Sequence, residues 1–138
     1  MSFCHSRTVR FGDIDAAGIV YYPRLLHYCH IAFEEFFGEV SAQPYSQWIE
    51  GEQLGFPTRK LHCEFLHPVT YGSTIDVEVR IAAIGDSSVD FRFCGAVRGE
   101  EPSFEVKALK VCIDLDSRRP MPIPPELKTL FASHLEEA

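Results

Sequence analysis

Two aspartates lie in a short segment bracketed by Gly12 and Gly18, just before a predicted helix start at Tyr22-Pro23. A carboxylate such as Asp13 or Asp15 can attack an acyl carbonyl or activate a water molecule. The first turn of a helix presents unpaired N–H groups and a partial positive charge, which can stabilise an oxyanion forming on that carbonyl. The segment therefore permits acyl-group chemistry, although a turn with capping aspartates would have the same composition.

A second group of reactive side chains lies on the predicted helix itself. His27, His30 and Glu34 follow the spacing i, i+3, i+7 and share one helix face, opposite the main apolar stripe. Two histidines and a carboxylate can bind zinc or iron. Because His62 and His67 belong to a different element, we expect this face to meet solvent or a second subunit, with no metal bound.

The five cysteines show no metal-binding or redox pattern, since their number is odd and no two form a CxxC pair. Most lie within apolar patterns, so we expect them to be reduced and the protein to be cytoplasmic. Cys29 lies on the apolar helix stripe, which argues against a role as nucleophile. No P-loop or GxGxxG pattern occurs, so the sequence predicts neither nucleotide hydrolysis nor a dinucleotide cofactor.

The 138 residues suit one domain spanning residues 1–138, because two domains would each lack a sufficient core. Thirteen Lys and Arg against twenty Asp and Glu give a net charge of -7, which makes nucleic acid an unsuitable partner. No apolar run reaches the roughly 18 residues of a membrane helix, and the first residues lack the pattern of a signal peptide. We therefore expect no membrane insertion.

Hydrophobic periodicity predicts the helices that must position these side chains. Apolar residues recur at three- and four-residue spacing over 22–38, which predicts a long helix ending near Gly38. A shorter helical turn is predicted over 45–50, and a final helix after Pro124-Pro125. The inward face of this last helix is expected to consist of Leu127, Leu130, Phe131 and Leu135.

Alternating apolar and polar residues predict strands in most of the remaining chain. These strands are expected at 8–11, 61–65, 75–83, 89–97 and 104–115. The last one changes phase, from Phe104, Val106 and Ala108 to Leu109 and Val111, which indicates a β-bulge or a strand covered on both faces.

The predicted elements add up to an α+β fold, in which an antiparallel sheet of about five strands wraps around one long central helix. Short turns join most of the strands, which favours antiparallel pairing. One helix covers only part of such a sheet, so we expect the remaining surface to bind further copies of the chain in a homodimer or homotetramer.

The stretch from Arg10 to Pro23 resembles the signature of the 4-hydroxybenzoyl-CoA thioesterase family of hotdog-fold proteins. The matching residues are Phe11-Gly12-Asp13, Asp15, Ala17-Gly18-Ile19-Val20 and Tyr22-Pro23. The chain also resembles 1,4-dihydroxy-2-naphthoyl-CoA thioesterases, with further likeness at Cys29-His30, Ala32 and Glu34. The resemblance implies a hotdog fold over nearly the whole chain. It also implies hydrolysis of an acyl-CoA thioester, with an aromatic acyl group, to free acid and CoA, without metal or other cofactor.

In that family the second aspartate of the loop is catalytic, and it corresponds to Asp15. The resemblance implies that Asp15 attacks the thioester carbonyl or activates water, while the backbone N–H of Tyr22 points at the thioester oxygen. Asp13 would brace the loop, and Gly18 would allow the backbone to approach the substrate closely.

The resemblance also implies residues that bind the acyl group and CoA. The expected substrate-binding set is Gly18, Ile19, Val20, Tyr21, His30, Glu34, Arg118 and Arg119. CoA carries several phosphate groups, which require arginine or lysine side chains. Besides Arg118-Arg119, the basic candidates are Arg59-Lys60, Lys107 and Lys110. Some hotdog thioesterases place the catalytic carboxylate on the central helix, where Glu34 or Glu35 would serve.

Three other functions fit parts of the pattern. Tyr21, Tyr22 and the phenylalanines of the helix offer flat apolar surface to an aromatic acyl group, but a short aliphatic acyl-CoA would fit too. A non-catalytic hotdog protein could bind acyl-CoA or an acyl carrier protein, but it would have little use for Asp15 beside the thioester. A hotdog dehydratase would pair a histidine with an acid near the central helix; His27 and His30 allow this, whereas the loop does not match it.

Overall fold

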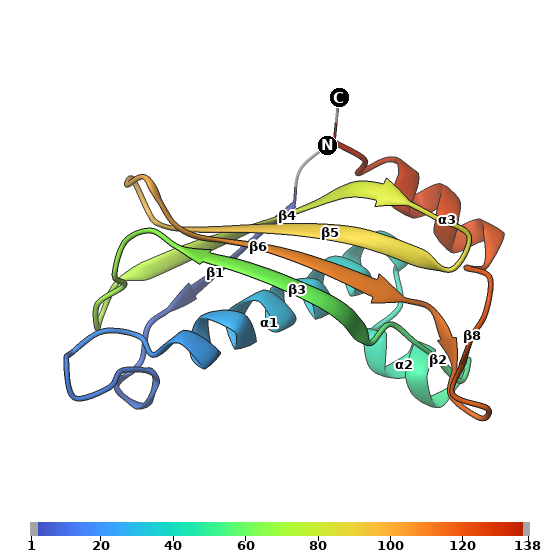
Figure 1. The fold of residues 1–138 in the computed structure, drawn as a ribbon, viewed down its shortest axis with the longest axis horizontal. Helices are drawn as coiled ribbons and strands as arrows, with labels where there is room; N and C mark the ends of the chain where they lie inside the picture. The colour runs from blue at the N-terminus through green and yellow to red at the C-terminus, as the bar shows by residue number, and fades with distance from the viewer. Residues whose placement is uncertain (1–2, 137–138) are drawn as a thin grey trace.

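A computed structural model describes residues 3–136 and shows three α-helices packed with two antiparallel sheets (Figure 1). The helices are α1 (Tyr22–Ser41), α2 (Tyr45–Glu50) and α3 (Pro125–Ala132), and a 3-10 turn, η1, covers Phe11–Asp13. The strands are β1 (Phe3–Thr8), β2 (Leu54–Gly55), β3 (Thr58–Phe65), β4 (Thr74–Ile84), β5 (Ser88–Val97), β6 (Pro102–Val111), β7 (Ile113–Asp114) and β8 (Arg119–Pro120). Within the described part of the chain, no helix is long and apolar enough to cross a membrane.

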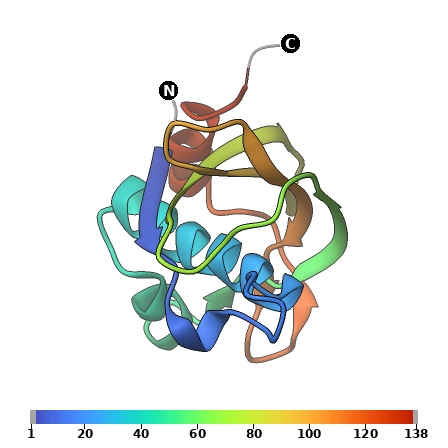
Figure 2. The same cartoon turned by 90° about the vertical axis from the view of Figure 1, so that its left-hand side faces the viewer.

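The larger sheet has five strands in the order β1-β4-β5-β6-β3, all antiparallel, and it curves around α1 (Figures 1 and 2). This confirms the expected α+β hotdog arrangement of a sheet around one central helix. The strands β2, β7 and β8 form a small second sheet near α2. The sequence pattern missed this sheet because each of its strands is only two residues long.

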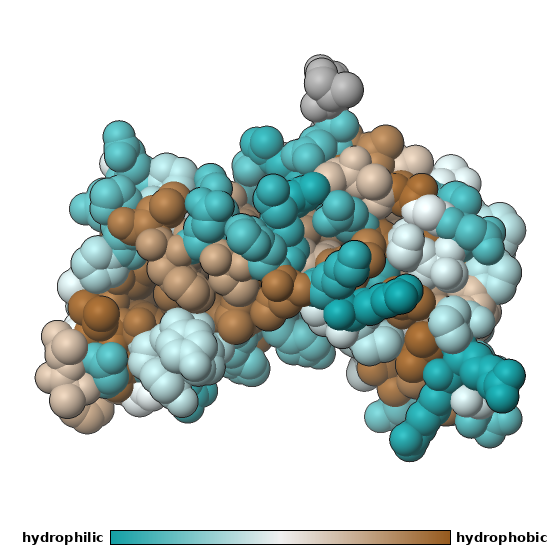
Figure 3. Space-filling model, viewed as in Figure 1, coloured by the Kyte–Doolittle hydropathy of each residue, from teal (hydrophilic) through white to brown (hydrophobic). Residues whose placement is uncertain are grey.

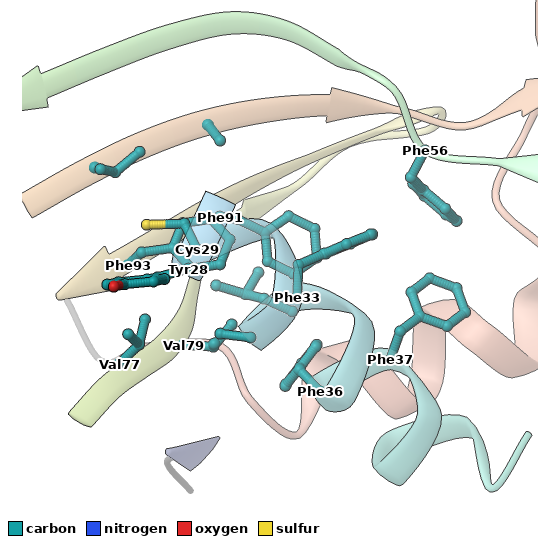
Figure 4. Packing of buried hydrophobic residues seen from close by; sticks show 14 of the residues in the cluster. Tyr28, Cys29, Phe33, Phe36, Phe37, Phe56, Val77, Val79, Phe91 and Phe93 are labelled. Atoms are coloured by element: carbon teal, nitrogen blue, oxygen red, sulfur yellow. The ribbon is translucent and has the colours of Figure 1, made fainter. Parts of the chain in front are cut away.

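The central helix α1 buries the apolar stripe that the sequence predicts. The buried residues are Leu25, Tyr28, Cys29, Ala32, Phe33, Phe36 and Phe37. Figure 4 shows the phenylalanines of α1 turned toward Phe91 of β5 and toward Phe56. Ring centroids of Phe33 and Phe36 lie 5.3 and 5.8 Å from that of Phe91, in edge-to-face contacts that hold the helix on the sheet.

The inner face of the sheet follows the predicted alternation. In β4 the fully buried residues are Ile75, Val77, Val79 and Ile81, and they alternate with Asp76, Glu78 and Arg80. In β5 the buried residues are Val89, Phe91 and Phe93. The predicted half-buried strands at 75–83 and 89–97 are therefore confirmed, with their apolar side toward α1.

The first strand differs from the prediction. It covers Phe3–Thr8 and not residues 8–11, where the turn η1 begins. β1 is an edge strand, and one of its inward side chains is Arg7, whose guanidinium lies 4.9 Å from the centre of the Tyr28 ring. Because an inward position of β1 carries an arginine, the strand lacks the alternation of apolar and polar residues that predicts a strand from sequence.

The helices α1 and α3 also differ in detail from the prediction. α1 continues past Gly38 and ends at Ser41, because packing of the last turn outweighs the roughly 1 kcal/mol that a glycine costs inside a helix. In α3, Leu127 and Phe131 are buried as predicted. The expected inward positions of Leu130 and Leu135 are wrong. Leu130 is 38% exposed because α3 buries only a narrow face, and Leu135, which is 44% exposed, lies beyond the end of α3 at Ala132.

A bulge interrupts the edge strand β3 opposite residues 109–110 of β6. Thr58 pairs with Lys110 and Lys60 pairs with Leu109, so Arg59 is the extra residue. Every residue of β6 from 104 to 110 pairs with both neighbouring strands, so the bulge predicted at its phase change does not occur in β6. Lys110 and Val111 are both buried, which fits the alternative of a strand covered on both faces at its end. Bulges bend an edge strand and redirect its side chains.

Candidate active site

Asp13 fixes the base of the glycine-bracketed loop to α1. Its carboxylate is 8% exposed and accepts hydrogen bonds at Oδ2 from the Arg10 amide (3.1 Å) and the Tyr28 hydroxyl (2.8 Å). The Tyr21 amide donates to the Asp13 carbonyl at 3.2 Å. Burial alone would raise the pKa of Asp13. The two hydrogen bonds to its carboxylate and two nearby arginines nevertheless hold this pKa below its ordinary value. Asp13 is therefore ionised and braces the loop.

Replacing Tyr28 with phenylalanine should lower the free energy of unfolding by about 1.5–2 kcal/mol, because a charged, buried acceptor loses a hydrogen bond. Urea unfolding at pH 7 measures this value, with Tyr71→Phe as control, since Tyr71 is 60% exposed. The lowered pKa of Asp13 means that its hydrogen bonds stabilise the fold above the ordinary aspartate pKa. The effect of Tyr28→Phe should thus shrink as the pH falls through the folded-state pKa, and an effect that does not change with pH would contradict this role.

Asp15 lies at the tip of the same loop, in a turn made by the backbone. The Ala17 amide donates to Asp15 Oδ1 at 2.8 Å, and the Gly18 amide donates to the Asp15 carbonyl at 3.0 Å. The Asp15 amide donates in turn to the Ile19 carbonyl at 2.9 Å. Gly18 has a φ of +80°, which glycine adopts without strain. One carboxylate oxygen is held by the turn, and the other makes no hydrogen bond to any residue in 3–136.

The start of α1 places a backbone donor next to this loop. Tyr22 is the first residue of the helix, so its N–H has no partner within the helix. Pro23 has no N–H, and the Arg24 amide donates to the Tyr21 carbonyl at 2.8 Å. The partial positive charge at this end of the helix and the free Tyr22 N–H would both stabilise an oxyanion that forms here.

Asp15 and Tyr22 line one pocket of about 400 Å³, and most of its lining is apolar. The sequence-predicted residues that join them there are Ile19, Val20 and Tyr21. Gly18 shapes the turn beside the pocket without lining it. The structure therefore brings together the loop and the helix start, as the resemblance implies.

The opposite wall of the pocket was missed by the sequence analysis. It consists of Phe65, Leu66, His67, Pro68 and Val69, at the end of β3 and just after it. The Val20 amide donates to the Val69 carbonyl at 2.8 Å, and Ile19 pairs with Thr70 in an isolated bridge. Such long-range pairing has no local sequence signal; the only hint is a pair of large apolar residues shortly before a proline.

His30 and Glu34 lie further along α1 and do not line the Asp15 pocket. His30 Nε2 is 3.8 Å from Glu34 Oε1. Glu34 and Glu35 line a broad depression of about 1090 Å³ beside β1 and α2, so neither alternative carboxylate shares the pocket of Asp15 in one chain. Among residues 3–136, no three His, Cys, Asp or Glu side chains form a group that could hold a metal ion.

The basic side chains considered for CoA phosphates lie in different places. Arg118 ends the turn between β7 and β8 and Arg119 begins β8, at the opposite end of the molecule from the loop that carries Asp15 (Figure 1). Lys60 and Lys107 line a depression of about 630 Å³ on the outer face of the sheet. Lys110 is only 5% exposed and faces the core, so its assignment as a surface phosphate ligand is wrong. Within one chain Arg118-Arg119 do not reach the pocket, and their role stays a prediction.

Comparison with known proteins gives consistent results at the level of sequence. Residues 9–131 match the thioesterase-like superfamily. A 1,4-dihydroxy-2-naphthoyl-CoA hydrolase of Nostoc punctiforme is 32% identical over 138 residues, which cover 100% of this chain and 92% of the relative. A protein of the same name from Thermosynechococcus vestitus is 28% identical, over 97% of this chain and 91% of the relative.

Solved structures agree with the fold. A 1,4-dihydroxy-2-naphthoyl-CoA thioesterase from Synechocystis superposes with a TM-score of 0.85 at 22% identity, over 96% of both chains. A gentisyl-coenzyme A thioesterase gives a TM-score of 0.85 at 26% identity, over 94% of this chain and 99% of the other. A thioesterase-superfamily structure from Jannaschia sp. gives 0.92 at 24% identity, over 99% and 94%. Since the family match spans most of the chain and includes the loop and α1, the protein belongs to the thioesterase-like superfamily.

Proposed function

We propose that this protein hydrolyses an aromatic acyl-CoA thioester to the free acid and CoA. The observation that carries the proposal is the shared pocket of Asp15 and Tyr22, in which a carboxylate and the positive end of a helix meet over an apolar cavity. Membership of the thioesterase-like superfamily supports the reaction class. The names of the relatives, which act on dihydroxynaphthoyl and gentisyl thioesters, support an aromatic acyl group.

The geometry suggests how the reaction proceeds. With the thioester carbonyl oxygen at the Tyr22 amide, the carbonyl carbon faces the free carboxylate oxygen of Asp15. Attack by Asp15 on the carbonyl carbon breaks the C–S bond, expels the CoA thiolate and leaves an anhydride, which one water molecule hydrolyses. That water gives one proton to the CoA thiolate and leaves the other on the acid product, so the Asp15 carboxylate is restored. Alternatively, Asp15 accepts a proton from a water whose oxygen attacks the carbon, and the C–S bond breaks in the same way. Both routes consume one water molecule and give the same products.

The pocket walls account for the preference for a flat acyl group. Tyr22 contacts Phe65 edge to face, with 6.2 Å between ring centroids, and Tyr21 contacts Tyr22 in the same way at 6.0 Å. Leu25 and Val69 complete an apolar slot next to them. An aromatic ring buries more surface against such walls than a short aliphatic chain does.

Free-thiol release from a panel of thioesters tests the proposal. The panel contains 1,4-dihydroxy-2-naphthoyl-CoA, 4-hydroxybenzoyl-CoA, a short aliphatic acyl-CoA and a long one. We expect the aromatic esters to have the highest kcat/KM. If only the aliphatic esters are hydrolysed, the protein is still a thioesterase, but the proposed preference for an aromatic acyl group is wrong. Binding of every ester without thiol release would indicate a non-catalytic acyl-CoA-binding protein.

The proposal includes a homodimer formed through the edge strand β3, with a homotetramer as a pair of such dimers. All residues of β3 but one are exposed, and the apolar side chains of Leu61, Phe65 and Leu66 are about half exposed. Figure 3 shows apolar surface, in brown, from the left end of this face toward its middle. An unpaired strand edge with apolar side chains is a template for pairing with another strand.

The proposal also places the protein in the cytoplasm, since the described cysteines are all free thiols.

Replacing Leu61 with glutamate should disrupt this dimer, because it places a charge where apolar surface would be buried. We expect multi-angle light scattering to show half the mass of the wild-type particle, or less. Leu130→Glu is the matched control, since Leu130 is 38% exposed on α3, away from β3, and should leave the mass unchanged. A wild-type mass of one chain, or an unchanged mass in Leu61→Glu, would contradict the β3 interface.

A further inference from the structure

The outer face of the five-stranded sheet carries its charges in rows that run across the strands. The pairing of β4, β5, β6 and β3 places one row side by side in this order: Arg80, Arg92, Lys107 and His62. The next row lies two residues along each strand, about 7 Å away, and consists of Glu78, Cys94, Glu105 and Glu64. We call the first set the basic row and the second set the acidic row.

Neighbouring charges within each row have the same sign, which is unfavourable in a single chain. Arg92 pairs with Arg80 on one side and with Lys107 on the other. In the acidic row, Glu105 pairs with Glu64. Like charges directly opposite each other on neighbouring strands destabilise a sheet. A partner that brings opposite charges to both rows would offset this repulsion.

Ion pairs within the chain leave one strand of the two rows uncompensated. In β4 and in β3, a glutamate of the acidic row pairs with the basic residue two positions away on the same strand. In β5, Arg92 pairs with Asp90, which belongs to neither row. In β6, Glu105 and Lys107 are exposed, and neither forms an ion pair with any residue in 3–136. This strand therefore presents one unpaired negative charge and one unpaired positive charge to the outside.

Both rows are accessible to a partner. The side chains of α1 and α3 pack on the inner face of the sheet, where Phe33, Phe36 and Phe131 contact Phe91. In Figure 2 the sheet curves around α1, so its outer face is directed away from this helix. The side chains of both rows are exposed or half-buried.

We propose that this face binds the same face of a second copy of the chain, with the basic row of each copy on the acidic row of the other. A twofold axis parallel to the rows, midway between them, produces this arrangement, because it turns each row of one copy onto the opposite row of the other. Glu105 then lies opposite Lys107 of the partner subunit, and the same pair repeats on the other side of the axis. A twofold axis parallel to the strands would instead place like charges against each other.

The inference rests on the homotetramer of the proposed function, since it specifies the face through which two β3 dimers meet. The β3 edge and the outer face are different surfaces, and twofold contacts through both of them close a tetramer. The β3 edge offers apolar side chains, whereas the outer face offers ion pairs. In roughly 1 M sodium chloride, where charges are screened beyond about 3 Å, the tetramer should therefore dissociate into β3 dimers.

Charge reversal in β6 tests the contact. Multi-angle light scattering should give four chains for the wild type but two for Lys107→Glu and two for Glu105→Lys, because each change places like charges opposite each other. The double variant with both changes should return to four chains, since the exchanged charges again face opposite charges. An equimolar mixture of the two single variants should also form particles of four chains. Lys128→Glu and Glu126→Lys are the matched controls, since both residues are exposed on α3, and neither should change the mass.

The same measurement separates this contact from the β3 dimer. Leu61→Glu combined with Lys107→Glu should give single chains. A wild type of two chains that only Leu61→Glu converts to single chains would overturn the outer-face contact and retain the β3 dimer. A wild type of two chains that only Lys107→Glu converts would support the outer-face contact and overturn the β3 dimer.

Further outcomes decide whether the charges act through this contact. An unchanged mass in both charge reversals, or a double variant that stays at two chains, would overturn the proposal. An unchanged mass together with a higher KM for every acyl-CoA thioester in Lys107→Glu would also overturn it, and would assign this lysine to the phosphates of CoA. The mass of the particle does not depend on turnover, so the test holds even if no thioester is hydrolysed.

Discussion

Replacing Asp15 with asparagine should lower kcat for an aromatic acyl-CoA thioester by about 10²–10⁴-fold. Asparagine has the same shape, and its side-chain oxygen can still accept the hydrogen bond from the Ala17 amide that closes the turn. An amide neither attacks a carbonyl nor accepts a proton from water at neutral pH. The loss should therefore appear in kcat with KM little changed, because the pocket walls and the Tyr22 amide are retained.

Free-thiol release under saturating substrate measures this loss, and circular dichroism confirms that the variant folds. Asp116→Asn is the matched control, since Asp116 is an exposed aspartate near the β7–β8 turn. Activity that survives in Asp15→Asn would contradict the assignment and would move the chemistry to Glu34 or Glu35. Those two carboxylates line the depression beside β1 and α2, so a second subunit would then have to bring one of them to the thioester.

The parts of the site that could be predicted from the sequence are those whose signals are local. A glycine at a left-handed position, an aspartate in a turn and a proline at a helix start are each fixed by neighbours a few residues away. The same holds for α1, whose apolar stripe needs only its own periodicity. The loop and the helix start therefore follow from residues 10–23 taken alone.

The far wall of the pocket and the inward position of Lys110 depend on contacts between distant segments. Residues 65–69 reach the pocket because the loop pairs with Thr70 and Val69, some fifty residues away along the chain. The sequence places Lys110 beside Leu109 and Val111, and their apolar character suggests that the lysine is the outward residue. In β6 the alternation of Phe104, Val106 and Ala108 continues without a register shift to Lys110, so the lysine faces inward.

The wild-type protein should gain about 3 kcal/mol of stability, relative to Lys110→Met, as the pH rises from about 8 to 10.5. Burial lowers the pKa of Lys110 from 10.5 to about 8 in the folded protein. Below pH 8 the folded state carries a buried ammonium that the unfolded chain solvates freely, so folding bears the full penalty. Between the two pKa values the folded state has lost this proton while the unfolded chain still binds it, so stability rises with pH. Above 10.5 the penalty is absent.

Urea unfolding of both proteins at several pH values between 7 and 10.5 measures this difference. Other groups titrate in the unfolded chain over the same range, but they do so equally in both proteins and cancel. The titratable side chains of α1 that face Lys110 are Cys29, whose pKa burial raises strongly, and His30, whose pKa burial lowers. Neither titrates between pH 8 and 10.5 in the folded state.

A pH-independent difference would show that Lys110 keeps its ordinary pKa, through solvent or a partner subunit, and would weaken its assignment to the core. If the free energy of unfolding of the wild type rises with pH relative to that of Lys110→Met, then burying this one amine destabilises the protein substantially at neutral pH. Such a cost at a position that an apolar residue would stabilise is characteristic of sites kept for function. Lys110→Met would then be more stable than the wild type at pH 7, because the variant buries no ammonium.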